Sequence, residues 1–63
     1  MSDVQWEEPF CGEGNSCFRI GTDANGNGYV ALVGAEDRYL TDSREALQQM
    51  IRDIKAGKAD HLL

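Results

Sequence analysis

Two strand-forming runs separated by a turn-rich stretch dominate the middle of the sequence. Residues 17–20 partly alternate apolar and polar side chains, and residues 29–33, written YVALV, are β-branched, apolar and aromatic. The stretch between them, GTDANGNG, consists mostly of Gly, Asn and Asp, which are the residues that tight turns favour. The sequence therefore predicts an antiparallel hairpin, and the rest of the chain has to pack around it.

Further strands are expected on both sides of this hairpin. Residues 38–41, written RYLT, form a third short run after the turn-like sequence GAED, so the central part of the chain predicts a β-meander. A short strand near residues 4–6 would add a fourth. An isolated hairpin is marginally stable in water, so the sheet needs a cover on one face.

The clearest helix is expected over residues 42–57. Asp42 or Ser43 can cap its first turn, with Asp42 and Glu45 approximating a capping box, and Gly57 suits the position just beyond its end. Apolar residues recur at the spacing of one helical stripe, namely Leu47, Met50, Ile51 and Ile54. We expect this stripe to be the main clamp on the sheet, so that Ile51→Asp unfolds the protein.

A chain of 63 residues makes one small domain, which buries roughly 60% of the surface of its unfolded chain. The expected organisation is an irregular acidic lead-in (1–15), a β-meander (16–41), a helix (42–57) and a tail (58–63). The fold class is therefore α+β, a three- to four-stranded antiparallel sheet packed by one C-terminal helix. So small a core leaves little room for a catalytic cleft, and we expect neither an enzyme nor a cofactor.

The negative charge of the chain is concentrated near the N-terminus. Residues 1–15 contain four acids and no base, although the net charge of the whole chain is only −5. Because nucleic-acid binding relies on clustered Lys and Arg, direct binding to nucleic acid is disfavoured, and a basic protein partner suits the segment better. The expected partner-binding residues are Trp6, Glu7, Glu8, Phe10 and Glu13. The alternative is that the carboxylates only keep the protein soluble.

The turn stretch raises a calcium alternative. Asp23, Asn25, Asn27 and Tyr29 occupy the first, third, fifth and seventh positions of an EF-hand-like loop, but the twelfth position is Gly34 rather than the bidentate Glu. The flanking residues also indicate strands instead of helices. We therefore expect a turn, with a weak metal site as the alternative.

The two cysteines, Cys11 and Cys17, have five residues between them in a glycine-containing stretch. No run of apolar residues is long enough to span a membrane, and no secretory leader pattern is present, so we expect a cytoplasmic protein with reduced thiols. A disulfide is the alternative. A zinc site is disfavoured because the only histidine is His61, near the C-terminus.

The order of segments resembles a known family. The segments are Trp6, then Gly14-Asn-Ser-Cys17-Phe-Arg-Ile, Tyr29-Val-Ala-Leu-Val, Tyr39-Leu-Thr, Ser43-Arg-Glu-Ala and Ile51-Arg-Asp-Ile-Lys-Ala-Gly-Lys. Together they resemble the small acidic actinobacterial proteins catalogued as domain of unknown function 397. The chain departs from the family pattern at Glu7-Glu-Pro-Phe, at Val33-Gly-Ala and at Ala46-Leu, where the family has Lys-Ser-Ser, Arg-Asp-Ser and an early helical Trp.

The resemblance implies a regulatory protein without catalytic residues. Members of this family look like companions of helix-turn-helix transcription regulators, and some pairs resemble toxin–antitoxin systems. The expected function is a non-enzymatic interaction module that binds such a regulator. Pairing of two copies through the sheet edge is a further expectation for so small a core.

Overall fold

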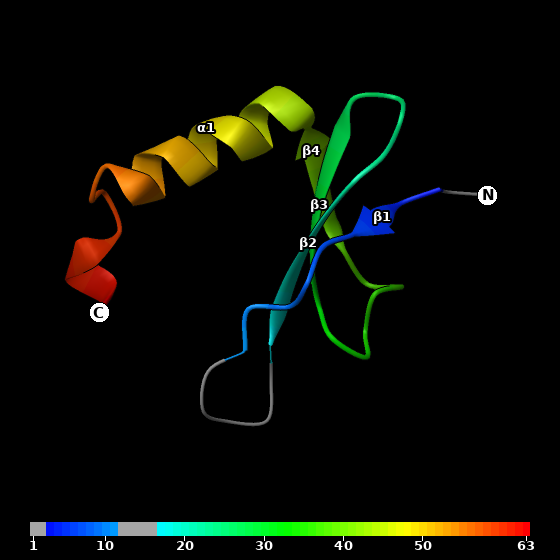
Figure 1. The fold of residues 1–63 in the computed structure, drawn as a ribbon, viewed down its shortest axis with the longest axis horizontal. Helices are drawn as coiled ribbons and strands as arrows, with labels where there is room; N and C mark the ends of the chain where they lie inside the picture. The colour runs from blue at the N-terminus through cyan, green and yellow to red at the C-terminus, as the bar shows by residue number, and fades with distance from the viewer. Residues whose placement is uncertain (1–2, 12–16) are drawn as a thin grey trace.

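The computed structural model describes residues 3–11 and 17–63. Its elements are, in chain order, β1 (Gln5–Trp6), β2 (Phe18–Thr22), β3 (Asn27–Leu32), β4 (Leu40–Ser43), α1 (Arg44–Lys55) and a 3-10 helix, η1 (Asp60–Leu62). The strands form one antiparallel sheet in the order β1-β2-β3-β4, and the helix follows at the C-terminal side (Figure 1). The predicted α+β fold, with its meander and single long helix, is confirmed.

The predicted hairpin is formed by β2 and β3. Phe18 pairs with Leu32 at its open end and Thr22 with Gly28 at its closed end. The backbone turns through Gly26, whose φ of 85° lies in the region that side chains with a Cβ rarely adopt. The Asp23 carboxylate accepts hydrogen bonds from the backbone N–H groups of Asn25 and Asn27, so the turn is closed by its own first residue.

The last strand begins two residues later than its sequence pattern predicts. The run 38–41 suggested a strand, but the connection after β3 continues to Arg38, whose N–H donates to the Ala35 carbonyl at 3.0 Å. Strand β4 consequently spans Leu40–Ser43 and pairs with the first half of β3. Tyr39 precedes the strand and packs edge-on against Tyr29, with ring centroids 4.9 Å apart.

The helix begins directly where β4 ends and carries local signals at both ends. The Ser43 hydroxyl accepts from the Ala46 N–H, so Ser43 is the N-cap, whereas Asp42 lies in the strand and accepts from the Ser43 N–H. At the other end, Gly57 has a φ of 100° and donates to the Ile54 carbonyl, while Lys58 donates to Asp53. These two bonds form the Schellman motif expected of a glycine after a helix.

The two faces of the sheet are covered unequally. Directly paired residues share a face, and faces alternate along a strand. Gly21 and Tyr29 therefore lie on one face, where the Trp6 ring packs over Gly21 and edge-on against Tyr29 at 6.1 Å. Gly28 lies on the other, where Leu47 of the helix packs against it. We call these the aromatic face and the helix face.

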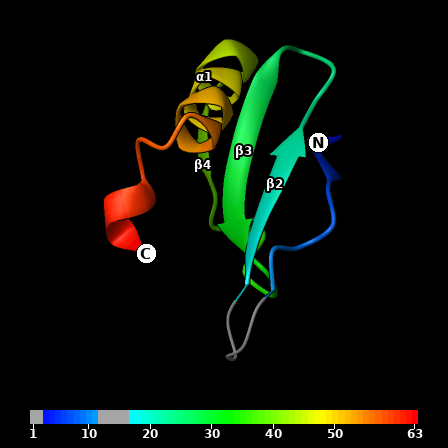
Figure 2. The ribbon, with the colours of Figure 1, turned by 60° about the vertical axis from the view of Figure 1, so that its left-hand side comes forward.

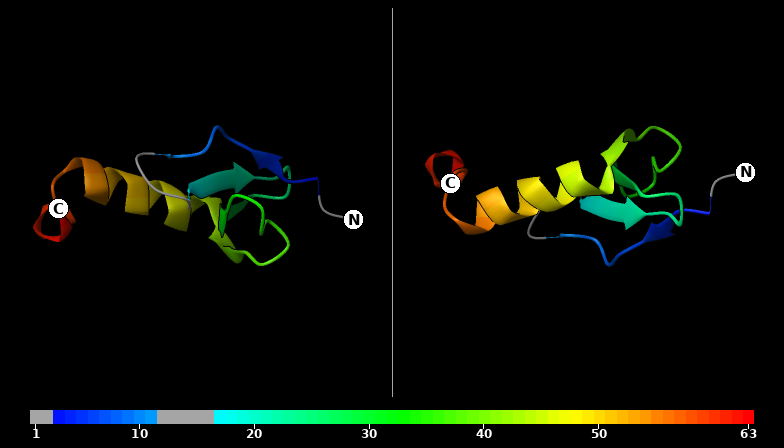
Figure 3. Two further views of the ribbon diagram at one scale, coloured as in Figure 1. Left: turned by 90° about the horizontal axis from the view of Figure 1, so that it is seen from below. Right: turned by 90° about the horizontal axis from the view of Figure 1, so that it is seen from above.

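The helix does not clamp the sheet as its apolar stripe predicts. Leu47 is buried, but Met50, Ile51 and Ile54 remain 41%, 43% and 52% exposed. The reason is geometric, because α1 starts at the end of β4 without a loop, so its first turns contact the sheet and the rest projects beyond it (Figures 1 and 3). The expectation that Ile51 is a core residue is therefore wrong. Tyr29, Ala31 and Leu47 are the buried apolar residues of the described chain.

Candidate protein-interaction surface

Residues 5–10 of the acidic N-terminal segment run alongside β2. This part of the segment therefore has a regular pairing that the predicted irregular lead-in did not include. After β1, the Glu7 N–H donates to the Ile20 carbonyl and the Phe10 N–H donates to the Phe18 carbonyl, both at 2.8 Å. Phe10 and Phe18 form an isolated antiparallel bridge. Residues 5–10 therefore hold a defined register against the sheet, and their side chains are presented from a fixed backbone.

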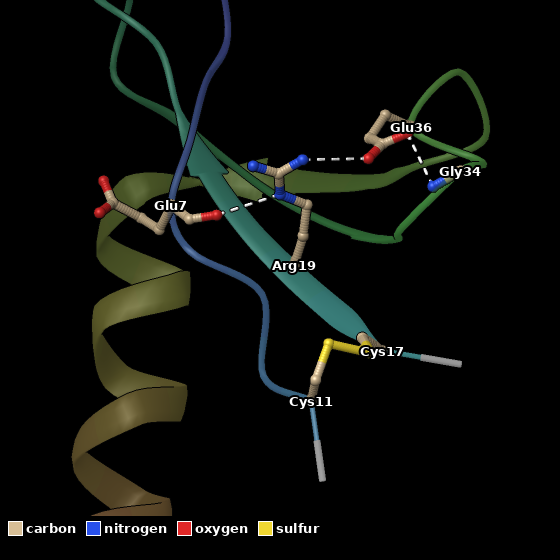
Figure 4. A network of polar contacts seen from close by, with 6 residues as sticks. All are labelled: Glu7, Cys11, Cys17, Arg19, Gly34 and Glu36. Carbon is tan, nitrogen blue, oxygen red and sulfur yellow. Dashed lines mark hydrogen bonds and ion pairs between the residues drawn. A yellow bond between two sulfur atoms is a disulfide. The ribbon is translucent and has the colours of Figure 1, made fainter. Parts of the chain in front are cut away.

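Arg19 ties this segment to the loop between β3 and β4. Its Nε donates to the Glu7 carbonyl at 3.0 Å, and its Nη1 forms an ion pair with Glu36 Oε2 at 3.2 Å (Figure 4). The other oxygen of Glu36 accepts from the Gly34 N–H at 3.0 Å. Backbone N–H groups of Glu36 itself and of Gly34, and then Arg19, hold the pKa of the Glu36 carboxyl below its ordinary value.

The carboxylates of Glu7 and Glu8 are not used by this network. Arg19 binds the backbone carbonyl of Glu7, and Figure 4 shows the Glu7 carboxylate turned away from the guanidinium. Both residues are exposed, and within residues 3–11 and 17–63 neither carboxylate accepts a hydrogen bond or forms an ion pair. They are therefore negative charges available to a partner.

The predicted aromatic contacts divide between the core and the surface. Trp6 is half-buried and packs on Tyr29, so it stabilises the aromatic face. Phe10 is 63% exposed, and so is its bridge partner Phe18. The alternation of residues 17–20 predicted a strand but not which of its side chains are covered. Glu13, the fifth predicted residue, lies outside the described residues.

The cysteines form a disulfide, so the expectation of reduced thiols is corrected. Cys11 and Cys17 are joined with an S–S distance of 2.00 Å, and their Cα atoms are 4.7 Å apart. Cys11 is exposed and follows Phe10, while Cys17 is half-buried and precedes β2 (Figure 4). The bond closes the end of the pairing between the N-terminal segment and β2, which is why the two cysteines meet.

The proposed calcium ligands form a turn around one buried carboxylate. Asp23 is only 8% exposed and accepts from the Tyr29 hydroxyl at 2.6 Å, from the Asn25 and Asn27 N–H groups and from Asn27 Nδ2. These bonds, that from Tyr29 foremost, lower the pKa of Asp23 to about 2, and the bond between Tyr29 and Asp23 is the main cause that raises the pKa of Tyr29. Donors from the chain itself engage both carboxylate oxygens, which favours the turn over the metal site.

A shallow apolar hollow lies where the helix leaves the sheet. Its volume is about 260 Å³, and it is lined mainly by Val30, Leu40, Thr41, Ala46, Leu47 and Met50. Sequence patterns gave no signal for it, because it depends on the angle between α1 and β4. Among the described residues there is no group of three or more His, Cys, Asp or Glu side chains placed to hold a metal ion.

The described residues include no helix with the length and apolar content needed to cross a membrane. Comparisons of the chain with protein-family models, with curated proteins and with solved structures found no match.

Proposed function

We propose that the protein is a non-enzymatic interaction module that binds a helix-turn-helix transcription regulator and modulates it, in an antitoxin-like or anti-regulator role. The observation that carries the proposal is the pair of exposed carboxylates on Glu7 and Glu8, which no other described residue engages, held on an ordered backbone beside the exposed Phe10. A basic partner surface with an apolar contact point complements this arrangement. The resemblance to domain of unknown function 397 supports the same class of partner.

The acidic surface would act mainly by attracting a basic partner and fixing its orientation in the complex. Exposed charges raise the association rate and select the partner, and their effect decreases as salt increases. The apolar contribution would come from Phe10, since aromatic side chains at the centre of an interface contribute most of its binding energy. Trp6 would act indirectly, by holding the segment against Tyr29.

The working compartment proposed for such a regulator partner is the cytoplasm. An exposed disulfide is commonly reduced there by the glutathione pool. We propose that the sheet and helix remain formed after reduction, because Glu7 and Phe10 are also held by backbone hydrogen bonds to β2. The runner-up function is a disulfide-stabilised structural module, which the Cys11–Cys17 bond favours.

A charge-reversal pull-down tests the proposed function. The immobilised protein is incubated with a purified helix-turn-helix regulator encoded beside its gene, at low and high salt. We expect the double variant Glu7→Lys/Glu8→Lys to lose capture, and the matched variant Asp37→Lys/Asp60→Lys, with the same change in net charge elsewhere, to retain it. Equal capture by both variants, or capture that does not respond to salt, would contradict the proposal.

A further inference from the structure

The accessible surface area of the folded chain is larger than that expected for a monomeric protein of the same mass. Its accessible surface is 5190 Å², whereas a monomeric protein of 7.0 kDa is expected to expose about 4,000 Å². Its radius of gyration is 12.3 Å, compared with about 10.6 Å for a compact domain of this length. The excess of roughly 1,000 Å² is similar to the ~800 Å² that each partner contributes to a standard protein interface.

Several large apolar side chains on the helix face are exposed. Val30 lies two residues after Gly28 in β3 and therefore on the same face, and its paired residues Ile20 and Leu40 share that face. Leu40 is 78% exposed although it occupies a strand directly beside the helix. The outer part of the α1 stripe adds three further exposed side chains, Met50, Ile51 and Ile54. Figures 1 and 2 show α1 leaving the sheet beside β4, so these exposed side chains lie on the helix and on the sheet next to it.

This face carries both halves of an apolar contact. The hollow between β3, β4 and the first turns of α1 can receive side chains, and the projecting stripe of Ile51 and Ile54 can supply them. A twofold interface needs a single patch that contains both members of each contact. The helix face meets this requirement without help from another protein.

The charges at the two ends of the face are also opposite. Asp42 lies at the end where the helix starts, on the same side of the sheet as Gly28, with which it pairs. Lys55 lies at the end of the helix and supplies the positive charge, since the following Lys58 is already ion-paired with Asp53 at 3.5 Å. Arg44 does not cancel Asp42, because its guanidinium is turned into the hairpin and donates to the Asp23 carbonyl. A second copy running in the opposite direction would place Asp42 of each copy near Lys55 of the other.

We propose that the helix face is an interface between two copies of this chain, related by a twofold axis perpendicular to α1. The projecting helical stripe of each copy occupies the hollow of the other, which replaces the edge-strand pairing that the sequence suggested. This inference goes beyond the proposed function and is independent of it, because Glu7 and Glu8 take no part in the interface.

Sedimentation equilibrium of the purified protein tests this proposal. We expect a mass of twice 7.0 kDa at micromolar concentration and a melting temperature that increases with protein concentration. Leu40→Glu and Ile51→Glu should each weaken dimerisation at least 100-fold, because each places a charge in the apolar interface. Gln49→Glu, on the side of the same helix opposite the stripe, is the matched control and should leave the dimer intact.

Exchanging the charges at positions 42 and 55 tests whether the two helices run in opposite directions. Recovery of the dimer in the double variant also shows that a single variant did not fail merely by unfolding. Asp42→Lys should weaken the dimer, and Asp42→Lys combined with Lys55→Asp should restore it. A parent protein that sediments as a monomer up to 1 mM, with a melting temperature independent of concentration, would overturn the proposal. So would a dimer that tolerates both glutamate variants, or a monomer that captures only a different protein through this face.

Discussion

The Tyr29 hydroxyl donates a 2.6 Å hydrogen bond to Oδ2 of Asp23, joining the body of β3 to the turn that precedes it. The same carboxylate accepts three further bonds from Asn25 and Asn27. A single buried anion therefore organises the tip of the hairpin. The charged form of Asp23 is the form that the fold requires.

The first prediction concerns stability in acid. Folding lowers the pKa of Asp23 from its ordinary value of 3.8 to about 2, so this carboxylate contributes stability above pH 3.8 that is lost as the pH falls through 2. We expect Asp23→Asn to lower the melting temperature at pH 6 and to flatten its decrease between pH 4 and pH 2. The control is Asp37→Asn, at an exposed position. If Asp23→Asn retains the pH profile of the parent, the assignment is wrong.

The second prediction concerns the contact between the helix and the sheet. A Cβ at Gly28 would lie 2.8 Å from Cβ and Cδ2 of Leu47, so Gly28→Ala should destabilise the protein by about 1–3 kcal/mol. Leu47→Ala should cost about 2–5 kcal/mol by leaving a cavity. Urea denaturation of both single variants and of the double variant checks the pair. We expect the double variant to lose somewhat less than the sum, since Leu47→Ala removes the close contact with Cδ2 but leaves the one with Cβ. Strict additivity would show that the two residues do not touch.

The third prediction concerns Arg19, which links the N-terminal segment to the β3–β4 loop. Arg19→Met removes the bond to the Glu7 carbonyl and the ion pair with Glu36. We expect faster hydrogen exchange at the N–H groups of Glu7 and Gly34, with little change at Tyr29 in the centre of the sheet. Arg19→Lys keeps the charge but lacks the planar fork, so it should protect at most one of the two sites. Unchanged exchange at both sites in Arg19→Met would contradict this role.

The fourth prediction concerns the disulfide. Reduction opens a loop of about seven residues, which by loop entropy should cost about 2 kcal/mol of stability and lower the melting temperature on the order of 10 °C. The double variant Cys11→Ser/Cys17→Ser should melt at the same temperature with and without reductant. The sheet should persist in both, as judged by circular dichroism. A collapse of the whole fold on reduction would show that the disulfide is essential to it.

Local features of the fold were predictable because adjacent residues encode them. The turn chemistry between Thr22 and Asn27 predicted the hairpin. Ser43 is the N-cap and Gly57 the residue after the C-cap, as predicted, although the helix is two residues shorter at each end than the predicted 42–57. Each of these signals depends on backbone geometry over a few residues. The position of β4 was less certain, since the turn after β3 includes Arg38 as well as the residues that favour turns.

The covering of each face was not predictable, because a pattern of apolar residues does not say what will lie against it. The stripe through Ile51 correctly indicates an amphipathic helix, yet its outer half faces no part of the described chain. The packing of Trp6, a predicted partner contact, over Gly21 was also not predictable, since only the pairing of β1 with β2 brings the two together. Likewise the spacing of Cys11 and Cys17 is compatible with a bond but does not require one.

The continuous passage from β4 into α1 has a mechanical consequence. Strand β4 ends at Ser43 and α1 begins at Arg44, so no loop separates the two elements. The Arg44 N–H donates to the Gly26 carbonyl at the hairpin tip. The helix therefore behaves as a rigid arm anchored at one end. Any molecule that displaces its far end would transmit torque to the turn around Asp23, more than 20 residues earlier in the chain.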